Sequence, residues 1–303
     1  MIGTVCRRGE KGASMARVGR FRNDAARAEY LRAYAAMEGL WPLPATTADV
    51  PTAYGPTHVR RSGSGEGLPL VLLHGFGGNG LYWHDVVGPL AADREVLALD
   101  TVGAAGRSVQ TAPLARDADY GAWFAQVLDG LGLDRVHVAG ESLGSWHAAL
   151  VALHAPDRVA SVSLIEPNGV VTRTPFRALV RMLGFGANPT EAGWRRMREW
   201  LTPGVYPTDA ELACMRAALG YRTAAGWARP LKDAELASIA PPLLALYGAE
   251  SVLSEPDAAR LRLAEHLPGA EVEIFPGGGH GVRGQVPDRV SARIAGFVAR
   301  NAV

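Results

Sequence analysis

Residues 136–146 constrain the fold of this chain more than any other segment. They predict a short apolar strand, the pentapeptide Gly140-Glu141-Ser142-Leu143-Gly144, and a helix that begins near Leu143. A serine at such a tight turn holds its hydroxyl clear of the backbone. The two glycines let strand and helix approach closely, and the helix N-terminus favours negative charge beside the serine. Because Gly and Ser are common residues, the rest of the chain must decide whether Ser142 is a nucleophile.

The chain around this segment alternates between apolar runs and amphipathic stretches. The continuous apolar run at residues 70–73 is typical of a strand that is covered on both faces, and residues 159–165 are also predicted to form a strand. Stretches with helical spacing, such as residues 119–131, lie between the runs. This alternation predicts an α/β fold with a mostly parallel, doubly wound sheet.

The same alternation divides the chain into three predicted parts. Residues 1–53 are expected to form an N-terminal extension with a disordered tail, a helix and a Trp-Pro strap. The sheet pattern occupies residues 54–167 and 241–303. Between them, residues 168–240 contain five prolines and predict several short helices, which we interpret as a helical cap inserted into one core.

Composition limits the partners and the compartment that we expect. The net charge is +1 at pH 7, which favours neither nucleic acid nor a membrane surface. No apolar run is long enough to span a bilayer, and the first 20 residues lack the apolar core of a secretory signal. The two cysteines, Cys6 and Cys214, make a disulfide framework unexpected. We therefore expect a cytoplasmic monomer or homodimer that acts on a small molecule.

A glycine-rich segment, His74-Gly75-Phe76-Gly77-Gly78, follows the apolar run 70–73. In an open α/β sheet, ligands bind beyond the carboxyl ends of the strands. The backbone N–H groups of Phe76 and Leu143 are therefore candidates for an oxyanion hole. His74 and Gly75 are expected to contact the substrate. The alternative interpretation of this segment is a plain glycine turn.

The segment Gly277-Gly278-Gly279-His280 follows the last predicted strand. A histidine at the end of a flexible glycine loop can reach across to take the proton of Ser142, whereas His74 is constrained by its strand end. The alternative is a solvent-exposed loop histidine. We predict that His280 is the general base.

In this order and spacing, the motifs resemble those of the α/β-hydrolase superfamily over residues 54–303. The motifs are residues 74–77, the turn from Asp100 to Ser108, residues 140–144 and Gly279-His280. The order of serine before histidine suits the triad of this superfamily and differs from the trypsin-like order. The resemblance implies a helical cap, a serine nucleophile and no metal or organic cofactor. The turn from Asp100 has one residue more than the family pattern, and we interpret it as structural.

The acid of the implied triad departs from the family pattern. Relatives usually carry the acid as Gly-x-x-Asp after the strand that follows the cap, but here this segment ends in Ser251. A serine cannot supply the charge that stabilises imidazolium. Glu166, at the end of the run 159–165, is our preferred candidate, because some lipases of similar fold place their acid there. Glu250, Glu255 and a site without an acid are the alternatives, and Glu166 could also be a structural carboxylate.

The predicted cap is rich in arginine and tryptophan. Its nine arginines either form solvated ion pairs, which we favour, or select an anionic substrate such as a carboxylate or a phosphate-bearing thioester. Trp194 and Trp227 are candidates for lining an apolar acyl pocket, and packing within the cap is the alternative.

The residues together predict a serine hydrolase that acts on a carboxylic ester, lactone or thioester. Ser142 would form an acyl-enzyme, with His280 as general base and then general acid. One alternative is a carbon–carbon bond hydrolase of a meta-cleavage-type diketone. A second alternative, from another class, is a non-catalytic ligand-binding protein on the same fold, which only the serine at position 251 supports.

Overall fold

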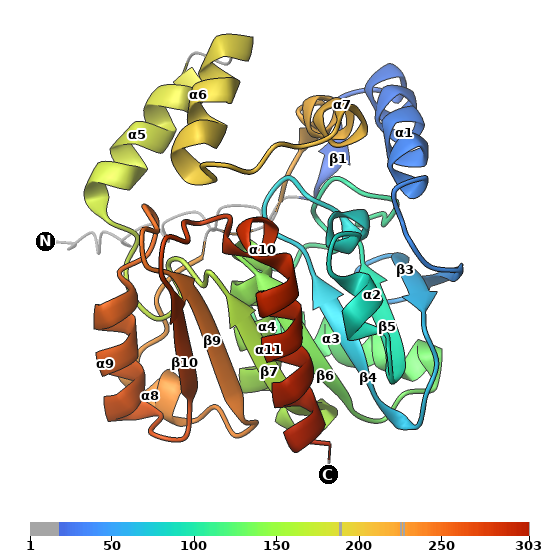
Figure 1. The fold of residues 1–303 in the computed structure, drawn as a ribbon. Coiled ribbons are helices and arrows are strands. Elements are labelled where there is room, and N and C mark those ends of the chain that lie inside the picture. The colour runs from blue at the N-terminus through green and yellow to red at the C-terminus, as the bar shows by residue number, and fades with distance from the viewer. Residues whose placement is uncertain (1–17, 188–189, 225, 227, 303) are drawn as a thin grey trace, which may run out of the picture.

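The computed structural model describes residues 18–187, 190–224, 226 and 228–302, and one sheet organises them (Figure 1). The strands of this sheet are β2 (Ala45–Val50), β3 (Thr57–Ser62), β4 (Gly67–Leu73), β5 (Arg94–Leu99), β6 (Val136–Glu141), β7 (Val159–Ile165), β9 (Leu243–Gly248) and β10 (Glu271–Phe275). Their order across the sheet is β10-β9-β7-β6-β4-β5-β3-β2. β2 and β3 are antiparallel to their neighbours, and the other six strands are parallel. The predicted mostly parallel α/β sheet is confirmed.

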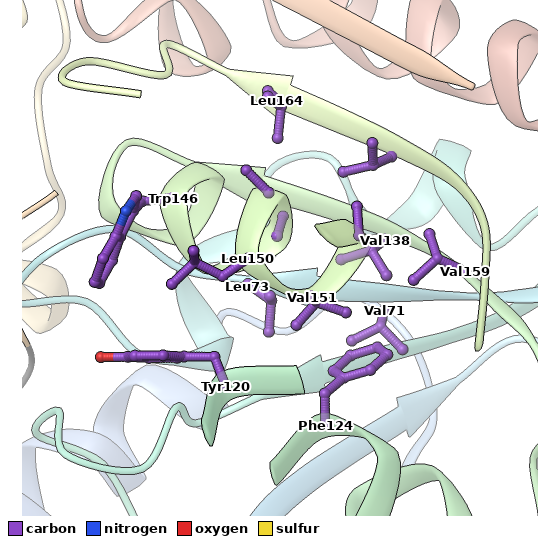
Figure 2. Packing of buried hydrophobic residues seen from close by; sticks show 14 of the residues in the cluster. Val71, Leu73, Tyr120, Phe124, Val138, Trp146, Leu150, Val151, Val159 and Leu164 are labelled. Atoms are coloured by element: carbon purple, nitrogen blue, oxygen red, sulfur yellow. The ribbon is translucent and has the colours of Figure 1, made fainter. Parts of the chain in front are cut away.

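Helices cover both faces of the sheet. The helices α3 (Asp117–Leu131), α4 (Leu143–His154), α8 (Asp233–Ala237) and α9 (Pro256–His266) bury their apolar side chains in one cluster, part of which Figure 2 shows. The helices α2 (Val87–Leu90) and α11 (Pro287–Arg300) contribute to a second cluster. Along β4, Val71 and Leu73 join the first cluster, and Leu70 and Leu72 join the second. The alternating directions of strand side chains therefore explain why this run is apolar throughout.

The N-terminal segment is tied to both the sheet and the helical region. Helix α1 (Asp24–Glu38) begins after Asn23, whose side chain accepts a hydrogen bond from the Ala26 N–H at 2.8 Å. α1 packs against α7 (Asp209–Ala218), and β1 (Arg20–Phe21) pairs with β8 (Tyr221–Arg222). The expected disordered tail falls largely on residues 1–17, which lie outside the described residues.

Strand β2 corrects the expected start of the sheet. It lies within the range 1–53 assigned to the extension, yet it pairs along its whole length with β3. Five of its six residues are exposed or half-buried, and only Val50 is buried. Because β2 is an edge strand with little apolar content, local hydrophobicity does not reveal it. The sheet therefore begins before residue 54.

Residues 168–240 leave the sheet after β7 and rejoin it at β9. They contain α5 (Phe176–Ala187), α6 (Glu191–Leu201), α7, β8 and α8. Figure 1 shows α5 and α6 as a hairpin that projects from the body, on the side where α10 (Val282–Gln285) lies. The boundaries of core and cap stay a prediction. No helix in the described ranges is long and apolar enough to cross a membrane.

Candidate active site

The turn between β6 and α4 holds Ser142 in a strained conformation. Its φ is 54° and its ψ is −115°, a region that side-chain-bearing residues rarely adopt. The Ser142 N–H donates to the Ile165 carbonyl oxygen at 2.8 Å. A Cβ at Gly140 would lie 2.1 Å from the Gly144 oxygen, and one at Gly144 would lie 2.1 Å from the Leu73 oxygen. Both glycines are therefore required for strand and helix to meet at Ser142.

His280 approaches Ser142 from the loop after β10. Its Nε2 lies 3.1 Å from the Ser142 Oγ, which is hydrogen-bonding distance. The loop itself is held by Gln285, whose Oε1 accepts from the Gly279 N–H at 2.7 Å and whose Nε2 donates to the Pro203 oxygen at 2.6 Å. Gln285 therefore connects the histidine loop to the segment that follows α6.

Glu166 completes the contact chain on the other side of His280. Its Oε2 lies 3.1 Å from the His280 Nδ1, and the side chain is fully buried. Glu166 directly follows β7 and, like Ser142, has a positive φ, at 49°. A carboxylate at this place favours a proton on Nδ1, which leaves Nε2 free to accept the proton of Ser142.

The carboxylate of Glu166 accepts hydrogen bonds from the last residue of β9 and from the segment that follows it. Its Oε1 accepts from the Gly248 N–H at 2.6 Å. Its Oε2 accepts from the hydroxyls of Ser251 at 2.6 Å and Ser254 at 3.1 Å. These donors compensate for the loss of water around a buried charge. Ser251, which occupies the usual position of the acid in relatives, thus donates to the Glu166 carboxylate.

The two other candidate acids do not join this chain of contacts in the part of the protein that the structure describes. Glu250 is exposed, and its N–H donates to the Gly278 oxygen at 2.7 Å. Glu255 is exposed just before α9. Among the three glutamates, the structure therefore brings Glu166 to His280.

The candidate oxyanion-hole residues border Ser142. Leu143 is the first residue of α4, a position whose N–H has no acceptor within the helix. Phe76 occupies a turn in which the Gly78 N–H donates to the Gly75 oxygen at 3.1 Å. A Cβ at Gly75 would lie 3.4 Å from the Ser142 Cβ, so this turn packs closely beside Ser142. An oxyanion hole formed by the Phe76 and Leu143 amides remains a prediction.

His74 does not have the geometry expected of a substrate-binding residue. It is buried, its Nε2 accepts from the Thr101 N–H at 3.1 Å, and its Nδ1 lies 2.9 Å from the Gly75 oxygen. Burial lowers the pKa of His74, so the ring is neutral and donates from Nδ1. Both ring nitrogens are engaged with backbone groups, and His74 therefore holds the loop in place instead of contacting the substrate.

Asn168 is a site residue that the sequence patterns did not reveal. Its Oδ1 lies 3.1 Å from the Ser142 Oγ. The residue belongs to a short turn in which the Asn168 N–H donates to the Glu166 backbone oxygen at 2.7 Å. The hydroxyl has one hydrogen, so it can donate either to Asn168 or to His280. If the Asn168 amide is flipped, its NH₂ donates to the Ser142 Oγ and the Ser142 hydroxyl donates to the His280 Nε2. Each of the three side chains then has a hydrogen-bond partner.

Arg283 is a second such residue, and it links the nucleophile turn to the histidine loop. Its Nε donates to the Glu141 Oε2 at 2.9 Å, and its Nη1 pairs with Asp85. The guanidinium also lies over the Trp83 ring, 5.1 Å from the centroid. Because Glu141 precedes Ser142 and Arg283 follows His280 by three residues, this buried ion pair ties the two loops together.

The acyl pocket lined by two tryptophans stays a prediction. Trp194 belongs to α6, and Trp227 lies outside the described residues. Within the described ranges, no group of three or more His, Cys, Asp or Glu side chains is placed to hold a metal ion.

Comparison with known proteins places this geometry in a family. A family model described as the alpha/beta hydrolase fold matches residues 69–212. The crystal structure of naproxen esterase (carboxylesterase NP) from Bacillus subtilis matches with a TM-score of 0.84 over 91% of this chain and 99% of that one, at 26% identity. This chain belongs to the α/β-hydrolase superfamily.

Two further proteins extend the comparison in sequence and in structure. The carboxylesterase YbfK of Bacillus subtilis (strain 168) is 28% identical over 281 residues, which cover 89% of this chain and 93% of that protein. The 2-hydroxy-6-oxo-6-phenylhexa-2,4-dienoate hydrolase from Rhodococcus sp. strain RHA1 matches with a TM-score of 0.68 at 20% identity, over 83% of this chain and 98% of that one. At that identity, the second likeness shows the fold alone.

Proposed function

We propose that this α/β-hydrolase is a carboxylesterase that uses Ser142, His280 and Glu166 as its triad. The observation that carries the proposal is the unbroken chain of contacts from Ser142 Oγ through both ring nitrogens of His280 to the buried Glu166 carboxylate. Two carboxylesterases similar to this chain over almost its whole length give independent support. The coarse reaction is hydrolysis of a carboxylic ester, and a lactone or a thioester is a narrower form of the same proposal.

The acylation step follows from this arrangement. The Ser142 Oγ attacks the ester carbonyl carbon while its proton passes to the His280 Nε2. The negative charge of Glu166 stabilises the imidazolium that forms, and the amides of Phe76 and Leu143 would stabilise the oxyanion. When the tetrahedral intermediate collapses, the carbon–oxygen bond to the alcohol breaks. His280 then gives its proton to the departing alcohol oxygen.

Deacylation repeats these roles with water. The neutral His280 removes a proton from a water molecule, whose oxygen attacks the acyl carbon of the Ser142 ester. The bond to the Ser142 Oγ then breaks, and His280 returns the proton to that oxygen. The products are the carboxylic acid and the regenerated enzyme, so atoms and protons balance over the two steps.

The role of Ser142 is tested by labelling with a fluorophosphonate probe and by turnover of p-nitrophenyl esters of several chain lengths. The Ser142→Ala variant is compared with Ser238→Ala, a change at an exposed serine outside the site. We expect labelling and turnover in the native chain and in the control, and neither in Ser142→Ala. Labelling that survives Ser142→Ala would contradict the proposal.

The same measurements separate the two alternative functions. Acid release from a vinylogous diketone without turnover of simple esters would favour a carbon–carbon bond hydrolase. Tight binding of a product-like carboxylate without any turnover would favour a non-catalytic protein. The non-catalytic alternative rests on the serine at position 251, and the hydrogen bond from Ser251 to the buried Glu166 carboxylate argues against it.

Two further parts of the proposal concern the state of the protein in the cell. We expect a cytoplasmic location, because the chain carries only two cysteines. We expect a monomer or a homodimer. Cell fractionation tests the location, and light scattering of the purified protein tests the oligomeric state.

A further inference from the structure

Helix α5 presents an apolar stripe to the outside of the protein. Phe176, Leu179, Val180 and Leu183 are each between 44% and 78% exposed. Their spacing of three, four and seven residues from Phe176 places them on one face of the helix. Single exposed apolar residues are common on protein surfaces, but a contiguous stripe of this kind marks an interaction surface.

The other sides of α5 are already occupied or charged. Ala178 is buried, and Arg181 lies over the ring of Trp200 on α6, 4.8 Å from its centroid. Arg177 is exposed, one residue after Phe176. In helical projection, Ala178 lies opposite the stripe, and Arg177 and Arg181 lie between the two. The stripe is therefore the face of α5 that the described part of the protein leaves uncovered.

The charge around the stripe is strongly biased. Residues 167–190 contain Arg173, Arg177 and Arg181 and no Asp or Glu. Over residues 167–201, six arginines stand against two glutamates, whereas the whole chain has a net charge of only +1. The cationic excess is thus concentrated on the α5–α6 hairpin, and it disfavours pairing of this face with the same face of a second copy.

We propose that the α5 stripe docks on a lipid surface that carries anionic headgroups. A helix with bulky apolar side chains on one face and arginines beside them lies in the plane of such an interface. The four apolar side chains would enter the boundary between headgroups and acyl chains, and the guanidinium groups of Arg173 and Arg177 would pair with lipid phosphates. The local distribution of charge thus predicts a partner that the net charge did not.

The stripe belongs to the end of the molecule that holds the candidate active site. The segment leading to α5 leaves the sheet at the carboxyl end of β7, directly after Glu166. Phe76, in the turn beside Ser142, is also exposed at the carboxyl ends of the strands. A lipid surface bound by α5 would therefore face this end of the sheet. The docking itself does not depend on esterase activity.

The test is co-sedimentation of the full chain with phosphatidylcholine vesicles, with and without phosphatidylglycerol. The variants are Leu179→Asp/Leu183→Asp on the stripe and Arg173→Glu/Arg177→Glu beside it. The matched control is Leu261→Asp, because Leu261 is 69% exposed on α9, away from the stripe. We expect the native chain and the control to bind anionic vesicles. Both double variants should bind at least about tenfold more weakly, and neutral vesicles should bind the native chain more weakly as well.

Several outcomes would overturn the inference. One is that the native chain does not bind anionic vesicles, and another is that Leu261→Asp weakens binding as much as the stripe variant. Self-association in light scattering that the stripe variant abolishes, without vesicle binding, would assign the stripe to a second copy. If the stripe variant raises KM for a water-soluble ester and the native chain does not bind vesicles, the stripe belongs to the substrate pocket. Circular dichroism shows whether each variant is folded.

Discussion

The carboxyl ends of β7 and β9 are neighbours in the sheet but contribute opposite things to the site. β7 is followed directly by a charged residue with a strained backbone, Glu166. β9 ends in Gly248 and is followed by the hydroxyls of Ser251 and Ser254, all of which donate to that charge. Relatives that follow the common pattern place the acid after the equivalent of β9. From this comparison we infer that the site needs a carboxylate beside the His280 Nδ1, and we predict that either of two adjacent strand ends can supply it.

The two strand ends also share the energetic requirements of a buried charge. A carboxylate without water is unstable unless donors surround it. β7 supplies the carboxylate, and the segment after β9 supplies most of its donors. Because adjacent strands lie about 5 Å apart, a side chain from one strand end can reach the loop of the next. Each strand end is therefore incomplete without the other.

The largest expected effect comes from moving the acid from β7 to the segment after β9. Glu166→Ser should lower kcat by roughly 10³–10⁴-fold, because the imidazole loses its charged partner. Adding Ser251→Asp to this variant should raise kcat again by at least about tenfold, since the side chain at position 251 lies next to the position of the Glu166 carboxylate beside His280. Adding Ser238→Asp on the surface is the control and should restore nothing. No recovery with Ser251→Asp in a folded double variant would break the proposed equivalence of the two strand ends.

A smaller effect is expected from removing the hydroxyl donors after β9. Ser251→Ala should lower the free energy of unfolding by about 2 kcal/mol, because a hydrogen bond to a buried charge is lost. It should also lower kcat by about tenfold through a less well-held carboxylate. Ser254→Ala should do less on both counts, since its contact is longer, at 3.1 Å against 2.6 Å. Urea unfolding and steady-state kinetics measure both, and a larger effect at Ser254 would reverse the assigned roles.

The smallest effect is expected inside β9, at Tyr247. Its buried hydroxyl has no hydrogen-bond partner among the described residues. Burial, and then the charge of Glu166, raise the pKa of Tyr247, so the hydroxyl stays protonated. Tyr247→Phe removes an unpaired polar group and should change the free energy of unfolding by no more than about 1 kcal/mol, in the stabilising direction. A clear loss of stability or activity would mean that Tyr247 supports Glu166 after all.

The parts of the fold and site that the sequence predicts are those fixed by local chemistry. Ser142 follows from two glycines that a strand-to-helix turn requires, and His280 follows from a glycine loop after a strand. The buried strands follow from continuous apolar runs, as at residues 70–73. In each case the residues that carry the signal are adjacent in the chain, so their pattern is visible without the fold.

The parts that the sequence leaves open depend on contacts between distant segments. The sequence favours Glu166 over Glu250, but it does not show the contact of Glu166 with His280 or the donors that the neighbouring β9 brings to the carboxylate. The structural place of His74 depends on the Thr101 N–H, and the role of Arg283 depends on Glu141 and Asp85. No local pattern encodes these pairings.

The central claim is that the Glu166 carboxylate orients His280 for Ser142. The most direct measurement compares kcat/KM of Glu166→Gln and Glu250→Gln for one p-nitrophenyl ester, with both variants shown to be folded. The kcat/KM of Glu166→Gln should fall by about 10³–10⁴-fold, since an amide can hold the wrong tautomer of the His280 ring. The kcat/KM of Glu250→Gln should stay within about twofold of the native value. A large loss at Glu250 with little change at Glu166 would contradict the account.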